Sequence, residues 1–394
     1  MNGRIRVVGT LVGDIQHQPD MRIKYGKLFD AIGRRFELLE VYDANLRGVQ
    51  RYWNAVSTFS PSISRWKEHF FKNVPAFEMR SHAAQKHFRD FRGRADVILQ
   101  LGVLFDVTQN DGELPVVIYT DNTTSITAQH PDSSRYPFTS GELKRWLSYE
   151  KLAYQRAAHI CTRAGIVKRS LIDDYSVPSE RISVIGGGLN FAALPEITQR
   201  APDAPFTVLF IGTDFYRKGG DLVLKAFGLV RKIIPNAQLI VVTHDTIQSG
   251  LAREGVRILA PIWEREKLEV LYRQADVFIL PSRLETWGDV LLEAMSFGLP
   301  CIGVNGQAME DIIVHGETGM LVAPEQVELL ANAIIELFER PDLRRKMGQA
   351  AYRLVDQEFT WDRVVDRLAP ILEATAHSLI PVSSHYSSLE RMSV

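Results

Sequence analysis

The sequence has little cysteine, with only Cys161 and Cys301 among its 394 residues. A disulfide framework is therefore excluded, and both cysteines fall in apolar segments that we expect to be buried strands. No run of about 18 apolar residues occurs, so we expect no segment that crosses a membrane. The first residues lead into an expected strand and lack the apolar core of a signal peptide, which predicts a cytoplasmic protein.

Patterns typical of metal or dinucleotide sites are also missing. The ten histidines show no metal-ligand spacing, so we expect no metal. The run Gly186-Gly187-Gly188 is followed by neither the third glycine nor the helix of a dinucleotide loop. We interpret it as a hinge or a close backbone approach between domains, and we expect no bound cofactor.

Charge is distributed unevenly along the chain. Residues 1–190 contain 26 Lys and Arg against 20 Asp and Glu, whereas the remainder contains 20 against 27. The first half therefore suits an anionic surface or acceptor better than the second half does. No recognition motif accompanies the charge, so we expect no nucleic-acid partner.

Residues 65–94 concentrate this basic character. They contain eight Lys and Arg, three acidic residues and six aromatic residues. Basic and aromatic side chains on helices suit an anionic membrane face, which would make the protein peripheral on the inner membrane surface. The alternative, to which we give more weight, is a core helix with a solvated basic side.

Short apolar runs alternate with helical patterns along the chain, which predicts parallel sheets with crossover helices. The expected strands are 5–10, 36–42, 97–101, 116–120, 159–163, 182–185, 206–212, 239–243, 256–259, 277–280, 301–304 and 320–322. Proline-rich residues 189–205 interrupt the alternation and predict a linker. We therefore expect a first domain over 1–195 and a second over 206–358, with a Ser-rich tail over 377–394 that we expect to be disordered.

The segment Pro281 to Val304 is the most informative part of the chain. It reads as strand, acidic turn, helix and strand, with Glu285 in the turn and Glu293 eight residues later. Ligands of open parallel sheets bind at the carboxyl ends of the strands, where this turn lies. The helix that begins near Gly288 has free backbone N–H groups and a partial positive charge, which suits a phosphate.

This segment resembles the E-x7-E motif of retaining glycosyltransferases of the GT-B architecture, in particular family 4. The resemblance continues over Ala294, Met295, Gly298 and Pro300. It implies that Glu285 orients the hydroxyls of the donor sugar and that Glu293 accepts hydrogen bonds from a ribose. The motif turn that would bind the donor comprises Trp287, Gly288, Asp289 and Val290. Asp289 stands where the family has an aliphatic residue, which places a negative charge beside the expected phosphate.

Residues 210–220 are similar to the family segment V-G-R-L-x-x-x-K-G. Lys218 occupies the position of the motif lysine, and Thr213 replaces the motif arginine. We expect the adjacent Arg217 to supply the missing charge, because two cations at a helix start can neutralise a diphosphate.

The first domain matches the family less closely. Gly13, after the first strand, is our candidate for backbone approach to the donor phosphate. Asp121, after the fourth strand, stands where the family often has a histidine, and it can either hydrogen-bond the donor sugar or cap the next segment. Residues 359–362 are similar to the F-S-W family hallmark, which implies that a helix over 360–376 crosses back to the first domain.

These observations predict two Rossmann-like domains that face each other across a cleft. We expect a metal-independent hexosyl transfer, with retention, from a nucleoside-diphosphate sugar to a hydroxyl on a glycan or lipid-linked acceptor. Cell-surface polysaccharide, lipopolysaccharide or glycolipid synthesis would use such a reaction. Two alternatives remain: an isomerase resembling nucleotide-sugar 2-epimerases, and a binding protein without activity, which the missing histidine and motif arginine would favour.

Overall fold

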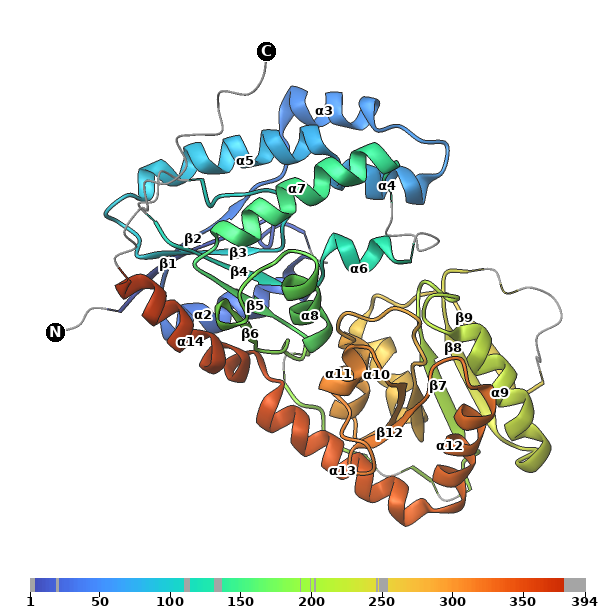
Figure 1. The fold of residues 1–394 in the computed structure, drawn as a ribbon. Coiled ribbons are helices and arrows are strands. Elements are labelled where there is room, and N and C mark those ends of the chain that lie inside the picture. Colours follow the sequence, from blue (N-terminus) through green and yellow to red (C-terminus); the bar gives the residue numbers. More distant parts are fainter. Residues whose placement is uncertain are drawn as a thin grey trace.

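The computed structural model describes residues 4–18, 21–109, 114–130, 137–191, 193–198, 200–201, 203–245, 247 and 254–378. Figure 1 shows two α/β domains joined by a linker and by a long helical segment at the C-terminal end. Each domain contains a six-stranded parallel sheet, so the expected fold class is confirmed. The predicted disordered tail lies, from residue 379 on, outside the described residues.

The first sheet has the strand order β2-β1-β3-β4-β5-β6. Its strands are β1 (Arg6–Leu11), β2 (Glu37–Asp43), β3 (Val97–Leu101), β4 (Val116–Thr120), β5 (His159–Thr162) and β6 (Ile182–Val184). The chain leaves β1 toward β2 and then returns to the other side of β1, so the direction of winding reverses between β1 and β3. In such sheets this reversal opens a crevice at the carboxyl ends of the strands.

Alternating apolar side chains create two core layers on this sheet. Along β3, Ile98 packs with α5 and α7, whereas Val97 and Leu99 pack with α2 and α14 on the opposite face. Both faces are covered, which explains why the strands lack polar alternation. The helices are α2 (Lys27–Arg35), α3 (Gly48–Ser57), α4 (Ile63–Phe71), α5 (Val74–Phe88), α6 (Thr124–Ala128), α7 (Ser140–Arg156) and α8 (Gly165–Asp173); a π-helical turn, η1 (Arg22–Gly26), precedes α2.

The second sheet has the order β12-β11-β10-β7-β8-β9, with its reversal between β7 and β10. Its strands are β7 (Thr207–Ile211), β8 (Gln238–Val242), β9 (Val256–Leu259), β10 (Val277–Ile279), β11 (Cys301–Val304) and β12 (Gly319–Val322). Its helices are α9 (Gly220–Ile233), α10 (Arg265–Gln274), α11 (Asp289–Ser296), α12 (Val327–Glu339) and α13 (Pro341–Glu358), with a short 3-10 helix, η4 (Ala308–Asp311).

The last helix, α14 (Trp361–His377), crosses back to the first domain as expected (Figure 1). Its residues Trp361, Val364 and Leu368 are buried in the layer formed by α2 and the first sheet. Arg34 of α2 also pairs with Asp362, with 2.6 Å between Nη2 and Oδ1. The crossing therefore fastens the end of the chain to the first domain.

The basic segment 65–94 folds as α4, α5 and a following 3-10 turn. Phe77, Phe88 and Phe91 are buried in the core of the first domain, and Arg80 is buried as well. These side chains face the core because they follow the apolar stripe of α5. The core-helix interpretation therefore describes α5, whereas no residue of α4 is buried, and a membrane face on this segment stays a prediction.

Candidate functional site

The predicted cation and the first predicted glutamate meet at the reversal point of the second sheet. Lys218 follows β7 and Glu285 follows β10, and these strands are neighbours in the sheet. The Lys218 ammonium forms an ion pair with the Glu285 carboxylate, which also accepts a hydrogen bond from Ser282. Both side chains are largely buried. A lysine and a carboxylate are thus in contact at the carboxyl ends of the strands, where ligands of open parallel sheets bind.

The backbone of Glu285 is held as firmly as its side chain. Its amide donates to the Gln307 side chain, with 3.0 Å between N and Oε1. Its carbonyl accepts from the amide of Ala308, with 3.1 Å between the oxygen and nitrogen. The position of the carboxylate therefore depends on contacts with the segment after β11, which the sequence pattern did not indicate.

Helix α11 begins directly after this turn. Gly288 precedes it with φ +146°, a conformation that side chains disfavour, so a glycine is required there. Trp287 is only 4 % exposed and packs against Phe359, with 5.9 Å between the ring centres. Its side chain packs in the core of the second domain, and its predicted contact with the donor stays a prediction. Val290 is partly buried against the core of the second domain.

Glu293, one turn into α11, is buried and already has two partners. One carboxylate oxygen accepts from Arg265 at 2.6 Å, and the other accepts from the Tyr272 hydroxyl at 2.9 Å. Burial raises the pKa of Glu293, although Arg265 and Tyr272 act in the opposite direction. The expected contact of Glu293 with a ribose stays a prediction. Its partner Arg265 was not identified from the sequence.

Arg217 has a different environment from the one we expected. Its guanidinium donates to Asp214 at 2.8 Å and to the carbonyl of Leu284 at 2.9 Å, and its side chain is 9 % exposed. Because Leu284 precedes Glu285, these contacts hold the glutamate turn. The geometry therefore favours a positioning role for Arg217 over the predicted neutralisation of a diphosphate.

The first domain contributes Gly13 and Asp121 at the carboxyl edge of its sheet. Gly13 has φ +139°, and its amide donates to Asp43, with 2.9 Å between N and Oδ1. Asp121, one-third exposed, lies 3.6 Å from the ammonium of Lys24. These contacts do not test binding of a nucleotide sugar, so the predicted donor contacts of Gly13 and Asp121 stay predictions.

Arg163 was missed by the sequence analysis. It follows β5, its side chain is 2 % exposed, and its Nη1 lies 3.5 Å from Oδ1 of Asp289 in the second domain. Its Nε and Nη2 have no hydrogen-bond partner among the described residues. This pair explains the unusual acid at the start of α11, whose charge faces an arginine of the other domain. A charged residue directly after a buried strand was the available signal.

A second contact between the domains lies two residues further along. The amide of Gly165, at the start of α8, donates to the carboxylate of Asp311 at 3.0 Å. The second domain therefore supplies an acceptor for a helix that lacks a side-chain cap of its own. Contacts at Arg163 and Gly165 together join the carboxyl edge of the first sheet to the second domain.

A groove of about 470 Å³ opens beside α2, next to the linker and the start of α14. Its lining includes Lys27, Asp30, Phe191 and Trp361. Burial lowers the pKa of Lys27 to about 8, and the positive charge of Arg265 acts in the same direction. Arg265, the partner of Glu293, lies 5.0 Å from the ring centre of Phe191, so the groove adjoins the start of α10.

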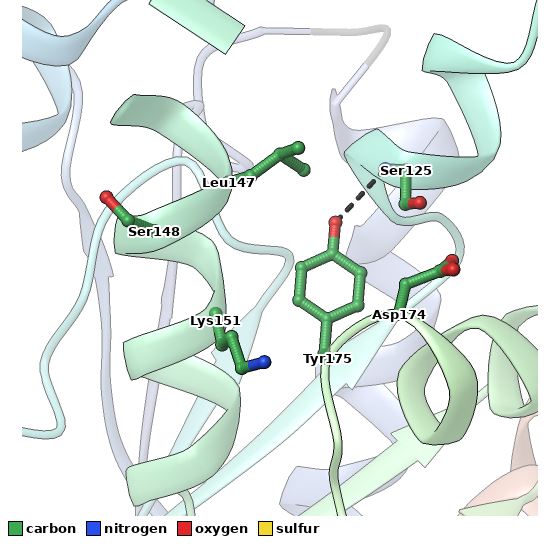
Figure 2. Close-up of a pocket in the computed structure, with 6 residues that line it drawn as sticks. All are labelled: Ser125, Leu147, Ser148, Lys151, Asp174 and Tyr175. Atoms are coloured by element: carbon green, nitrogen blue, oxygen red, sulfur yellow. Dashed lines mark hydrogen bonds between the residues drawn. The ribbon is translucent and has the colours of Figure 1, made fainter. Parts of the chain in front are cut away.

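A smaller hollow of about 180 Å³ lies wholly within the first domain (Figure 2). Figure 2 shows Tyr175 pointing toward α6, where its hydroxyl accepts from the amide of Ser125 at 3.0 Å. The same hydroxyl donates to the buried Glu150, with 2.5 Å between the oxygens. Glu150 also accepts from Thr124, so this carboxylate fixes the start of α6. We assign this network to structure.

In the part of the chain that the structure describes, no three His, Cys, Asp or Glu side chains gather as metal ligands. Metal independence stays a prediction, because the absence of such a cluster does not test it. Among the same residues, no helix combines the length and apolar character needed to cross a bilayer.

Residues 196–354 match the family described as glycosyl transferases group 1. The second domain belongs to the group 1 glycosyltransferases. Its matched range includes Lys218, Glu285 and Glu293, whereas Gly13, Asp121 and Arg163 lie outside it. The candidate residues of the second domain thus lie within the matched range, and those of the first domain do not.

Individual relatives agree with this assignment. The chain is 33% identical over 172 residues to a GDP-mannose-dependent monoacylated alpha-(1-6)-phosphatidylinositol monomannoside mannosyltransferase from Corynebacterium glutamicum, covering 40% of this chain and 44% of that protein. It is 25% identical over 243 residues to a glycogen synthase from Mycobacterium tuberculosis, covering 59% and 58% of the two chains. The chain thus spans about half the length of the curated relatives it matches.

Solved structures resemble the whole chain. A sucrose-phosphate synthase from Thermosynechococcus elongatus has a TM-score of 0.63 at 18% identity, covering 94% of this chain and 99% of that chain. At this identity the likeness shows the fold, which is the GT-B fold of glycosyltransferases.

Proposed function

We propose that this group 1 glycosyltransferase transfers a sugar from a nucleoside-diphosphate sugar to a hydroxyl acceptor. The observation that carries the proposal is the contact between Lys218 and Glu285 at the reversal point of the second sheet. The start of α11, with its unpaired backbone N–H groups, follows the same turn. An anion-binding helix start, a lysine and a carboxylate suit a diphosphate joined to a sugar.

The departing nucleoside diphosphate concentrates negative charge, so the main requirement is electrostatic stabilisation. Lys218 would supply a positive charge, and the start of α11 would supply backbone donors. An arriving diphosphate would compete with Glu285 for the Lys218 ammonium. Glu285 would then be released to accept hydrogen bonds from the hydroxyls of the donor sugar.

Glu293 and its partner Arg265 would bind the ribose end of the donor. We further propose that the reaction proceeds with retention and without a metal, as the E-x7-E resemblance implies. A lipid-linked or glycan acceptor is supported by the relative from Corynebacterium glutamicum, whose name specifies a GDP-mannose donor and a phosphatidylinositol mannoside acceptor. A cytoplasmic location and synthesis of cell-surface glycans are part of the same proposal.

A two-step experiment tests this function. Thermal shift with a panel of nucleoside-diphosphate sugars identifies the donor, because a ligand that binds only the folded state raises its stability. The radiolabelled donor is then incubated with and without alcohol acceptors. Label that moves to an acceptor supports transfer, and its anomeric configuration reports retention. A new nucleotide sugar formed without acceptor would indicate an isomerase, and binding without either product would indicate a binding protein.

A further inference from the structure

Helix α3 and the loop that follows it present an unusual concentration of apolar side chains to solvent. Six of the seventeen exposed large hydrophobic residues of the described chain fall between Val49 and Ile63. They are Val49, Tyr52, Trp53, Val56, Phe59 and Ile63, and each is more than half exposed. The first four have the spacing of one helix face. We call these six residues the α3 face.

The side of α3 that contacts the protein is polar instead. The buried residue of the helix is Asn54, whose amide donates to the carbonyl of Phe70 at 2.9 Å. Trp66 of α4 donates its indole N–H to the carbonyl of Ala55, also at 2.9 Å. Helices on globular proteins normally bury their apolar stripe and expose their polar side. The arrangement of α3 is reversed, which indicates that its apolar side contacts something outside the domain.

The stretch of sequence that carries the α3 face has charge of one sign. No Asp or Glu occurs between Ala44 and Lys67 in the sequence. Four basic residues in this stretch are exposed: Arg47, Arg51, Arg65 and Lys67. An apolar face with Trp and Tyr among exposed arginines and lysines complements an anionic lipid surface, where aromatic side chains reach the interface and cations contact the headgroups.

We propose that the α3 face docks the protein on an anionic lipid bilayer. In Figure 1, α3 lies on the side of the first domain that is remote from the second domain, so docking leaves the region between the domains open. The proposed surface overlaps the basic segment 65–94 at Arg65 and Lys67 and extends it to the exposed residues of α3. The proposal does not depend on the transfer reaction, and it places the first domain at the membrane, where a lipid-linked acceptor would be found.

Co-sedimentation with vesicles tests the proposal on the full chain. Vesicles of phosphatidylcholine with phosphatidylglycerol should bind the protein, and vesicles of phosphatidylcholine alone should bind it weakly. The double variant Tyr52→Ser/Trp53→Ser should lose binding to both. Arg47→Gln/Arg51→Gln should weaken binding to the anionic vesicles about thirtyfold, because each basic residue near such a surface contributes roughly a factor of five. High salt should have a similar effect.

Trp263→Ser is the matched control, since this exposed tryptophan lies on the second domain and its removal should leave vesicle binding unchanged. Equal vesicle binding by the wild type and Tyr52→Ser/Trp53→Ser would overturn the proposal, as would absence of wild-type binding. Light scattering measures the oligomeric state and so tests whether a second copy of the chain covers the α3 face. A wild-type dimer that Tyr52→Ser/Trp53→Ser converts to a monomer would show that a second copy covers α3, which also overturns the proposal. Thermal melting of each variant confirms that it is folded.

Discussion

Arg163 at the end of β5 and Asp289 at the start of α11 form an ion pair between the two domains, with 3.5 Å between Nη1 and Oδ1. The two partners differ in burial, because the Arg163 side chain is 2 % exposed and that of Asp289 is 33 % exposed. Water can replace Arg163 around Asp289, but it cannot reach Arg163 when Asp289 is removed. The two single substitutions should therefore have unequal costs.

We predict that Asp289→Leu lowers the free energy of unfolding more than Arg163→Met does. The first leaves a buried cation without its partner, which costs roughly 3–5 kcal/mol, whereas the second leaves an acid that solvent can hydrate. The double variant should be more stable than Asp289→Leu alone. Urea denaturation of the four proteins measures this coupling. Additive effects would mean that the pair contributes nothing to the contact between the domains.

Glu285→Gln should abolish turnover and leave the affinity for the nucleoside diphosphate largely intact. Glu285 would contact the donor sugar, so its loss affects the transition state more than the bound nucleotide. Its removal also frees Lys218 from a carboxylate, which would not weaken diphosphate binding. Kinetics and calorimetry measure the two quantities. Glu339→Gln, on the exposed end of α12, is the control, and normal turnover by Glu285→Gln would remove this residue from the site.

Glu293→Gln should weaken the binding of a nucleoside diphosphate about 10- to 150-fold, because hydrogen bonds to a charged acceptor contribute roughly 1.5–3 kcal/mol. Its buried contacts with Arg265 and Tyr272 make a second explanation available, since the variant could disturb the helix. A 2′-deoxy nucleotide separates the two. If Glu293 contacts the ribose, the 2′-deoxy nucleotide should bind the wild type weakly. Its affinity should then be little lower for Glu293→Gln than for the wild type. If Glu293→Gln weakens binding of the 2′-deoxy nucleotide as strongly as it weakens binding of the ordinary nucleotide, the effect is structural.

The fold was predictable because its signals are local. Apolar runs such as Val97–Leu101 and Cys301–Val304 match β3 and β11 in their bounds, since a strand covered on both faces is largely apolar. Helix limits depend on finer signals, as for α7, which begins at a capping box formed by Thr139 and Glu142. The contact between Lys218 and Glu285 was not predicted, because the sequence does not show that the strands before them are neighbours in the sheet.

Partners that come from other parts of the chain were not predictable from the sequence. Arg163 and Asp289 are separated by 126 positions, and nothing in the sequence around either residue indicates that they form a pair. Arg217 was predicted as a ligand cation because motif position carries no information on Asp214 and Leu284 as partners. The burial of Phe77, Phe88 and Arg80 within the basic segment 65–94 was unpredictable for a related reason, since composition does not show which helix face the core covers. Those contacts depend on tertiary packing.

Substitution of Arg217 separates positioning from charge. Arg217→Lys keeps the positive charge, but it cannot reproduce the paired contacts of a guanidinium with Asp214 and Leu284. If Arg217 holds the Glu285 turn, the turnover of Arg217→Lys should fall almost as far as that of Arg217→Ala. Adding Thr213→Arg to Arg217→Ala should then restore little. If Arg217 neutralises a diphosphate, lysine should retain much of the activity, and Thr213→Arg should recover part of it. Steady-state kinetics of these variants distinguishes the two roles.

The buried carboxyl of Glu150 should make stability depend on pH. Burial raises the pKa of Glu150 to about 7 from its ordinary 4.5, although Tyr175 and Thr124 act in the opposite direction. Because the folded pKa lies above the unfolded value, the folded protein binds more protons between these two values. This contribution is fully present below the unfolded pKa and is lost as pH rises through the folded pKa. Comparison with Glu150→Gln isolates it from other groups. The free energy of unfolding of the wild type, relative to that variant, should fall by about 2–3 kcal/mol between about pH 5 and about pH 8. A difference that stays constant over this range would show that Glu150 is ionised in the folded protein throughout.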